Sequence, residues 1–356
     1  MAYRVAQILA SESIATAGTK TIEINDTMPI SRLTIRVKGT NSSSTPTAHP
    51  AKMVTKIELI DGSDVLYSLS GVKAAGMNFI EEKQLPFSIV EYENNIECCQ
   101  TYHLNFGRYL MDKEYALDPK RFSNLQLKIT HNKALGGSAP DAGTLAVFAH
   151  IFDKGGVTPK GFMMTKEQRE YTLSASAREV TELARDYPYR FIVIQTYVTE
   201  VAFNTNISNI KLTVNNDERL LVNDITASEL LKVMGWHDKV EEDFAGLGTG
   251  SAVDHFVAST YENYAVAIGR SASQTTLIVS QPAGPRIEVT NDSSESFQAH
   301  ANGYAPFGCM NIATGDEMDP TDWIDPRQMR SFQLDIKAGS SASGNVAILS
   351  QQARTY

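Results

Sequence analysis

The sequence contains few of the residues that mark disulfide-rich, zinc-binding or membrane-spanning proteins. Its only cysteines are Cys98, Cys99 and Cys309, which match neither an even disulfide framework nor a metal-binding spacing. We therefore expect three reduced cysteines in the core, where free cysteine is most often found. No stretch of about 18 apolar residues predicts a transmembrane helix. Residues 1–10 lack the apolar core of a secretory signal, so synthesis in the cytoplasm is expected.

Positive charge is also scarce. The chain has 32 Lys and Arg against 41 Asp and Glu, which gives a formal net charge of −9 at pH 7. Proteins that bind nucleic acid need clustered Lys and Arg to release phosphate counterions, so no direct contact with nucleic acid is predicted. In contrast, the 42% hydrophobic and 21% charged residues are ordinary values, and 356 residues suffice for two folded domains.

The common catalytic motifs are missing as well. No His-x-His pair, Gly-x-Ser-x-Gly elbow, phosphate-binding Walker loop or zincin helix occurs. Residues 246–250 are glycine-rich, but an acidic stretch precedes them instead of a strand, so we interpret them as a flexible loop. We expect no catalytic residue, no bound cofactor and no enzymatic activity. No shared metal role is predicted for the seven scattered histidines: His49, His103, His131, His150, His237, His255 and His300.

Acidic residues supply only weak hypotheses for a site. Four aspartates recur at every third position, namely Asp316, Asp319, Asp322 and Asp325. Carboxylates on an irregular loop could hold Ca²⁺, which makes this segment a possible weak calcium site. Five glutamates of the first half could include a glycosidase-like pair, although we interpret them as solvated surface residues: Glu81, Glu82, Glu91, Glu93 and Glu97.

Short β-strands dominate the predicted secondary structure. Apolar and polar residues alternate with the strand period of two, and Gly, Asn, Asp or Pro bounds most of the runs. Helical patterns are few: Thr226 could cap a helix over 226–234, with Glu229 at the capping-box spacing, and 177–185 is a weaker candidate. The predicted strands are Arg32–Val37, Lys56–Ile60, Leu125–Ile129, Phe191–Ile194, Ile210–Val214, Leu277–Val279 and Phe332–Ile336.

An internal repeat is the most informative feature of the sequence. Asp118–Ile129 aligns without gaps on Asp325–Ile336, with Asp, Pro, Gln, Leu and Ile at the same places. Phe-Gly precedes both segments, and a Gly-initiated apolar strand follows both. The first parts of the two copies, before these segments, match more loosely. Two copies of one β-domain are therefore expected in tandem.

The repeat divides the chain into four parts. We predict an N-terminal arm over residues 1–17, a first domain over 18–153, a linker over 154–169, and a second domain over 170–356 that includes the C-terminal tail. The second domain has longer loops, mainly over residues 238–322. The number and spacing of the strands predict an all-β fold of two eight-stranded jelly-roll sandwiches with a few short helices.

Several segments resemble a known family, the double jelly-roll major capsid proteins of tailless, often membrane-containing bacteriophages, whose architecture is shared with adenovirus hexon. The resemblance covers nearly the whole chain. It is carried by the repeat and by loose patterns at Ile57–Val65, Leu104–Tyr109, Tyr115–Pro119, Asn124–Ile129 and Arg185–Tyr189.

This resemblance implies a major capsid protein located in the virion and made in the host cytoplasm. Three chains would form a homotrimer whose six jelly rolls give a pseudo-hexagonal capsomer, and these capsomers would tile an icosahedral shell. Partners would be neighbouring capsomers and penton or minor capsid proteins. An internal membrane could contact the arm over residues 1–17, although its single Arg4 predicts a weak contact. Outward towers would come from residues 238–322 and, as a smaller candidate, 39–50.

Two other functions stay open at this point. A trimeric carbohydrate-binding spike or fibre protein would also be rich in β-strands. A glycan-processing enzyme on paired jelly rolls is less favoured, because it normally needs secretion and aromatic platforms. The chain has only two tryptophans, Trp236 and Trp323.

Overall fold

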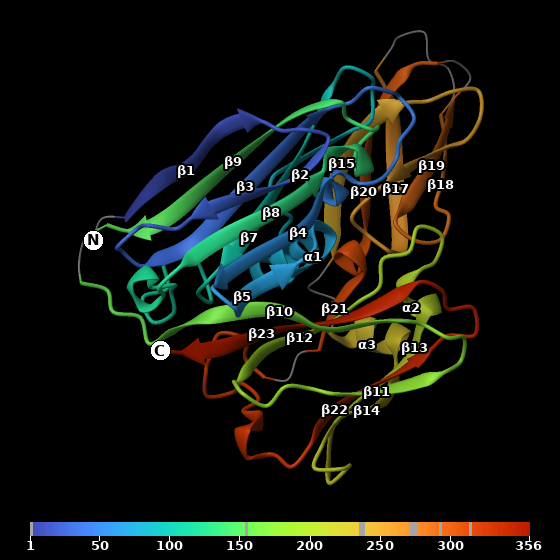
Figure 1. The fold of residues 1–356 in the computed structure, drawn as a ribbon. Coiled ribbons are helices and arrows are strands. Elements are labelled where there is room, and N and C mark those ends of the chain that lie inside the picture. The colour runs from blue at the N-terminus through green and yellow to red at the C-terminus, as the bar shows by residue number, and fades with distance from the viewer. Residues whose placement is uncertain (1–2, 154–155, 235–238, 271–276, 292–293, 313–314) are drawn as a thin grey trace.

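The computed structural model describes residues 3–153, 156–234, 239–270, 277–291, 294–312 and 315–356. Two jelly rolls lie against each other, and a smaller β-rich insertion stands at one side (Figure 1). Both chain ends lie on the side away from this insertion. Within the described residues, none of the helices has the length and apolar character needed to cross a membrane.

The first jelly roll is a sandwich of two sheets. One sheet has the order β1-β9-β3-β7-β6 and the other the order β2-β8-β4-β5. The strands are β1 (Tyr3–Ser13), β2 (Ala17–Glu23), β3 (Ile30–Thr40), β4 (Val54–Asp61), β5 (Asp64–Leu69), β6 (Ser88–Glu91), β7 (Glu97–Asn105), β8 (Leu125–Asn132) and β9 (Ala142–Phe152).

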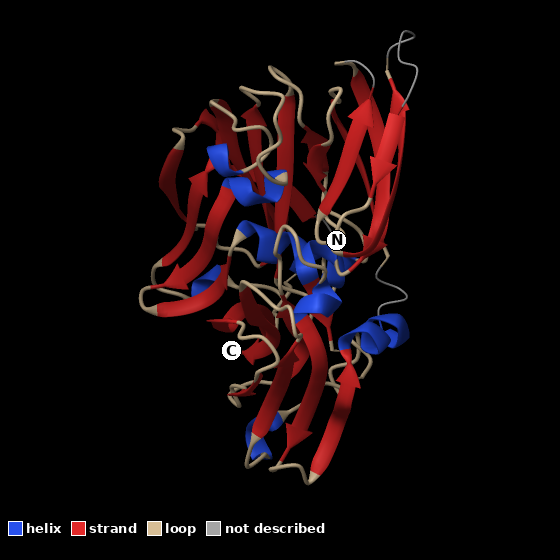
Figure 2. Ribbon diagram, turned by 90° about the vertical axis from the view of Figure 1, so that its right-hand side faces the viewer, coloured by secondary structure: helices blue, strands red, loops and turns tan. Residues whose placement is uncertain are grey.

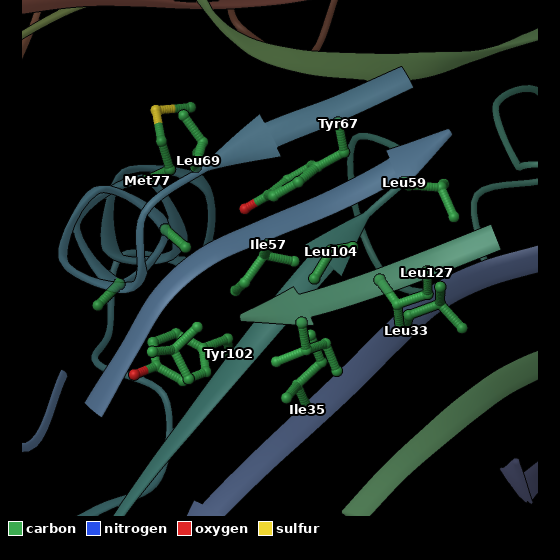
Figure 3. Close-up of a cluster of buried hydrophobic side chains, with 14 of the residues drawn as sticks. Leu33, Ile35, Ile57, Leu59, Tyr67, Leu69, Met77, Tyr102, Leu104 and Leu127 are labelled. Atoms are coloured by element: carbon green, nitrogen blue, oxygen red, sulfur yellow. The ribbon is translucent and has the colours of Figure 1, made fainter. Parts of the chain in front are cut away.

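Alternation of side chains along the strands produces the first core. In β3, Leu33, Ile35 and Val37 are fully buried, whereas the residues between them, such as Thr34 and Arg36, are only partly buried. Successive strand residues point to opposite faces, so one face meets the other sheet and one faces outward. Figure 3 shows this inner face, where Leu33 and Ile35 pack with Ile57, Leu59, Tyr67, Leu69, Met77, Tyr102, Leu104 and Leu127.

The second jelly roll repeats this arrangement. Its sheets have the orders β10-β23-β12-β21 and β11-β22-β13-β14, which correspond strand for strand to β1-β9-β3-β7 and β2-β8-β4-β5. The internal repeat therefore reflects two copies of one topology. The strands are β10 (Gly161–Thr172), β11 (Arg178–Glu182), β12 (Tyr189–Gln195), β13 (Ile207–Val214), β14 (Arg219–Thr226), β21 (Cys309–Asn311), β22 (Phe332–Ala338) and β23 (Asn345–Thr355).

The best-matched repeat segment has the same local structure in both copies. Asp118 and Asp325 each precede a 3-10 turn that starts with proline, η2 (Pro119–Arg121) and η5 (Pro326–Gln328). Each aspartate side chain accepts a hydrogen bond from the backbone N–H two residues later. A core strand, β8 or β22, follows in both cases.

Helices connect the strands. The predicted helix at 226–234 is α3 (Ala227–Met234), and Thr226 accepts the Glu229 N–H at 3.3 Å. The longest helix, α1 (Gly71–Glu82), starts at Ser70 and was not predicted. The short elements are α2 (Phe203–Asn206), η1 (Pro50–Met53), η3 (Lys133–Leu135) and η4 (Pro306–Gly308).

Four expectations from the sequence need correction. Residues 1–17 are not a free arm, because Tyr3–Ser13 forms β1 and pairs along β9. The expected linker at 154–169 already contains β10 from Gly161, where Phe162 and Met164 are buried. Residues 177–185 contain β11 rather than a helix, which agrees with their β-branched residues. Gly246 belongs to a strand, not a loop. The division into 18–153 and 170–356 stays a prediction.

The extra length of the second copy folds into the insertion, which we define as residues 240–304. It contains a sheet of β15, β20 and β17 that continues the first sheet through β6, and a three-stranded sheet β16-β19-β18. Phe244, Phe297 and Val289 are among the residues of its own core. Its strands are β15 (Val240–Leu247), β16 (Val253–Phe256), β17 (Tyr261–Gly269), β18 (Leu277–Ser280), β19 (Arg286–Asn291) and β20 (Ser296–Tyr304).

Candidate functional site

The two jelly rolls are joined by a continuous β-sheet. β5 of the first copy pairs in parallel with β10 of the second, with Tyr67 opposite Thr165 and Ser68 opposite Lys166. The order β2-β8-β4-β5-β10-β23-β12-β21 therefore crosses both jelly rolls. Figure 2 shows the halves one above the other, with helices between them. The backbone itself thus fixes their relative orientation.

Strand β12, in the part of this sheet that belongs to the second jelly roll, is buried on both faces. Phe191 and Val193 of β12 belong to the core of the first jelly roll, whereas Ile192 and Ile194 belong to the core of the second. Such burial favours a continuous apolar run over alternation. The junction is therefore hydrophobic core rather than a hinge.

Helix α1 fills the junction beside this sheet. Gly76 lies against Cys309 of β21, and a Cβ atom at position 76 would clash with the Cys309 sulfur. The close approach explains a glycine in the middle of a helix, where it is otherwise unfavourable. All three cysteines are free and buried, as predicted.

Lys73 of α1 links the two copies through charge. Its Nζ lies 2.7 Å from Glu167 Oε2 and 2.5 Å from Glu170 Oε2, both on β10. Burial alone would lower the pKa of Lys73, but the two carboxylates outweigh it and raise this pKa above its usual value. The ammonium group therefore stays charged at the junction.

A second polar cluster lies at the end of α1. Glu82 accepts hydrogen bonds from Arg32 Nη2 at 2.9 Å and Asn105 Nδ2 at 2.9 Å, and lies 2.8 Å from His103 Nδ1. Burial would raise the pKa of Glu82, but His103, Arg32 and Asn105 together lower it. This carboxylate is thus held in its ionised form.

The neighbouring carboxyl group behaves differently. Glu81 accepts hydrogen bonds from Asn105 and from Gln351 of β23. Burial raises its pKa to about 7, because the hydrogen bond from Asn105 and the charge of Arg190 only partly offset the loss of solvation. Arg190 Nη1 donates to Gln351 Oε1 at 2.8 Å, which extends the cluster into the second jelly roll.

The insertion is tied to the first jelly roll by a buried pair. His49 Nδ1 accepts the Ala51 N–H at 3.0 Å, so Nε2 carries the proton and donates to Glu242 Oε1 at 3.0 Å. Glu242 Oε2 accepts the Ala258 N–H at 2.8 Å. His49 is fully buried. Every polar atom of the pair has a partner, as buried polar groups require.

The aspartate-rich segment does not gather its carboxylates. Asp316, Asp319 and Asp322 accept hydrogen bonds from backbone N–H groups of their own loop. Asp325 pairs with Arg327, with Oδ2 and Nη2 2.6 Å apart. Over the described part of the chain, no group of three or more His, Cys, Asp or Glu could hold a metal ion. The weak calcium site stays an untested prediction without support from this geometry.

The histidines and acidic residues of interest are also dispersed. His49 and His103 serve the two polar clusters above, and His255 is buried in the insertion. His237 lies outside the described residues. Of the five glutamates, Glu81 and Glu82 have Asn105 as a common partner, and Glu91 and Glu93 have Arg270. Sequence reasoning missed the junction residues, since their partners are far apart along the chain.

Together, the repeated strand order and the shared sheet define a double jelly-roll protein. No protein-family model and no curated protein matches the sequence. Solved structures do match over nearly the full length of the chain. The chain therefore has the fold found in double jelly-roll major capsid proteins.

Three matches show the extent of this likeness. The major capsid protein P2 from bacteriophage PM2 has a TM-score of 0.58 at 8% identity, over 99% of this chain and 98% of that chain. The MCP of STIV, the Sulfolobus turreted icosahedral virus, has 0.59 at 11% identity, over 100% and 97%. A chain of the PBCV-1 virus capsid has 0.59 at 9% identity, over 99% and 93%.

Proposed function

We propose that this protein is a major capsid protein, a structural subunit rather than an enzyme. The observation that carries the proposal is the duplication of one jelly-roll topology within a rigid, fused body. The matching solved structures of PM2, STIV and PBCV-1 are capsid proteins, and the match covers 93–98% of their chains. Such a subunit functions by its shape and its contacts.

The duplication has a geometric consequence for assembly. Three copies around an axis place six similar jelly rolls in a ring, so a trimer has a nearly hexagonal outline. Each chain then meets the next through one heterologous contact, repeated three times until the ring closes. Hexagonal tiles cover a surface, and the homotrimer is therefore the proposed capsomer of an icosahedral shell in the virion.

The fused junction suits this role. The buried sheet, the Lys73 bridge and the Glu81–Glu82 cluster hold the two jelly rolls in one orientation. A hinged pair would present a variable outline and could not tile regularly. The insertion lies away from both chain ends, which supports an outward position for the insertion and an inward position for the ends (Figure 1).

Its partners would be neighbouring capsomers and penton or minor capsid proteins. A membrane contact through residues 1–17 is not proposed, because residues 3–13 are engaged in a sheet. Production would take place in the host cytoplasm.

Light scattering coupled to size exclusion, followed by electron microscopy of the particle, tests the proposal. The expected results are a particle of three chain masses in solution and a shell of pseudo-hexagonal capsomers. A stable monomer, or a protein confined to the vertices of the particle, would contradict the proposal.

A further inference from the structure

The outer face of the insertion carries a group of exposed apolar side chains. On edge strand β17, Tyr264, Val266 and Ile268 point to the same side and are 55%, 50% and 71% exposed. The residues between them belong to the inner side, where Ala265 is part of the insertion core. We call the outer side of β15, β20 and β17 the insertion face.

Strand register places polar residues in the middle of this face. His300 of β20 lies opposite Val266 on one side and Asp243 of β15 on the other. Gln298 lies opposite Ile268. Residues of this region line a hollow of about 420 Å³, among them Asp243, Val266, Ile268 and His300.

The face continues onto the first jelly roll. β6 pairs in parallel with β15 and antiparallel with β7. Val90 of β6 belongs to the insertion core, so by alternation Ile89 points outward; it is 36% exposed. Phe87, just before this strand, is 64% exposed, and its carbonyl accepts the Thr101 N–H, which extends the pairing with β7. Exposed apolar groups thus flank the polar middle on both sides.

The size of this surface fits a protein interface. Phe87, Ile89, Tyr264, Val266 and Ile268 together expose roughly 500 Å² of apolar area, which is at the upper end for a monomer. With the polar residues between them, the face approaches the ~800 Å² that each partner buries in a stable complex. Exposed apolar surface of this extent is unfavourable in water unless it is covered.

The charged side chains of the face have partners within the chain. Asp243 lies 2.8 Å from His300 Nδ1, and Glu241 lies 3.4 Å from Lys239. Arg270, at the edge of the hollow, lies 3.4–3.5 Å from Glu93 and Glu91. The whole chain carries a net charge of −9, which repels another copy in general. On this face, Asp243, Glu241, Glu91 and Glu93 each have a hydrogen-bond or ion-pair partner within the chain, so covering the face leaves none of these four carboxylates without a partner.

We propose that the insertion face is a contact surface for a second copy of this chain. This inference rests on the proposed trimer, in which three insertions stand at the same end of the capsomer. The face then contacts a different surface of the neighbouring chain, as a closed ring requires. When the neighbouring chain covers the β17 side chains, the insertions contribute an apolar interface. This interface adds to the one that the jelly rolls of adjacent chains form.

Site-directed cross-linking tests this contact directly. The natural cysteines are all buried, so a single exposed cysteine takes up a thiol-linked benzophenone. Val266→Cys places the label on the insertion face. Val180→Cys is the matched control, because Val180 is also a valine on an edge strand and is equally exposed at 50%, but lies on the outer sheet of the second jelly roll.

On irradiation of the purified trimer, the label at position 266 is expected to cross-link two chains. The yield of cross-linked dimer should be several times the yield from the label at position 180. Peptide mapping should place these links in another copy. Trimers with no such link from 266 would overturn the inference while the proposed capsomer stands. In intact particles, links from 266 only to a different virion protein would also overturn it. A monomeric wild-type protein would instead remove the proposed function itself.

An aspartate substitution provides an independent measurement. Val266→Asp should lower the denaturant concentration at which the trimer dissociates, whereas Val180→Asp should leave it nearly unchanged. Circular dichroism of both variants checks that the fold is retained. Equal dissociation of the two variants and the wild type would contradict the proposed contact.

Discussion

At the scale of single residues, buried polar groups carry much of the specific structure. His255 illustrates this point in the insertion. Its Nδ1 donates to the Val253 carbonyl at 3.0 Å, and its ring packs against Tyr92, Phe244 and Phe297. Nε2 has no hydrogen-bond partner within the described structure. Burial lowers the pKa of His255 to about 4 from 6.5.

This pKa shift predicts an insertion that weakens in acid. The unfolded chain binds a proton at higher pH than the folded one, so the stabilising effect is complete above about pH 6.5 and is lost as the pH falls toward 4. At pH 5 the loss is on the order of 2 kcal/mol. After correction for the intrinsic exchange rate, which is itself slower at pH 5, the amides of β16 and β19 should therefore be less protected at pH 5 than at pH 7.5.

His255→Phe removes this titration and keeps an aromatic ring in the pocket. Its exchange rates, corrected for intrinsic chemistry, should depend less on pH than those of the wild type. An unchanged pH dependence would contradict the assignment to His255.

Charge at the junction gives a second prediction at this scale. Lys73→Met leaves Glu167 and Glu170 without their common cation, so the free energy of unfolding should fall by about 2 kcal/mol. Lys160→Met serves as the control. Lys160 also bonds a carboxylate, Glu114, at 2.8 Å, but it is exposed to solvent, where such pairs contribute little. Equal effects of the two substitutions in urea unfolding would argue against the bridge.

At the scale of elements, α1 shows how tertiary packing overrides local preference. A glycine inside a helix normally costs about 1 kcal/mol relative to alanine. Gly76 nevertheless occupies the middle of α1, where it approaches Cys309 closely. The close approach of α1 to β21 therefore requires a glycine at position 76.

Gly76→Ala should accordingly destabilise the protein by about 1–3 kcal/mol, despite the better helix propensity of alanine, because the added methyl group displaces β21 or α1. Gly250→Ala is the control, since nothing lies within 4 Å of a Cβ at position 250. Thermal unfolding compares the two variants. A stabilised Gly76→Ala protein would show that the junction tolerates the extra volume.

At the scale of the whole molecule, the end of the second copy returns to the first. The Tyr356 hydroxyl accepts the Asp118 N–H at 2.5 Å and donates to the Ala116 carbonyl at 2.8 Å. The Tyr356 ring packs against Phe122 and Phe162. The last residue thus fastens one jelly roll to the other, opposite the insertion.

Tyr356→Phe should lower the free energy of unfolding by about 1–2 kcal/mol, because the Asp118 N–H and Ala116 carbonyl lose their common partner. Tyr3→Phe provides the comparison, since Tyr3 is 58% exposed on edge strand β1. Differential scanning calorimetry would measure both. No difference between the two variants would indicate that water replaces the hydroxyl.

Features that depend on neighbouring residues along the chain can be predicted from the sequence. Alternation of apolar and polar residues placed the predicted strands, including those at Arg32–Val37 and Phe332–Ile336. The repeat predicted a second copy of the same topology, and Thr226 marked the start of α3. Periodicity and capping are local properties, so one chain is enough to reveal them.

The way in which the two copies meet depends on contacts that form only in the folded protein. The pairing of β5 with β10, the contact of Glu81 with Gln351, and that of His49 with Glu242 join residues far apart in sequence. Edge β1 was mistaken for an arm for the same reason, since its partner β9 lies at the other end of the copy. Such pairings depend on which surfaces become adjacent on folding, and no local pattern encodes that.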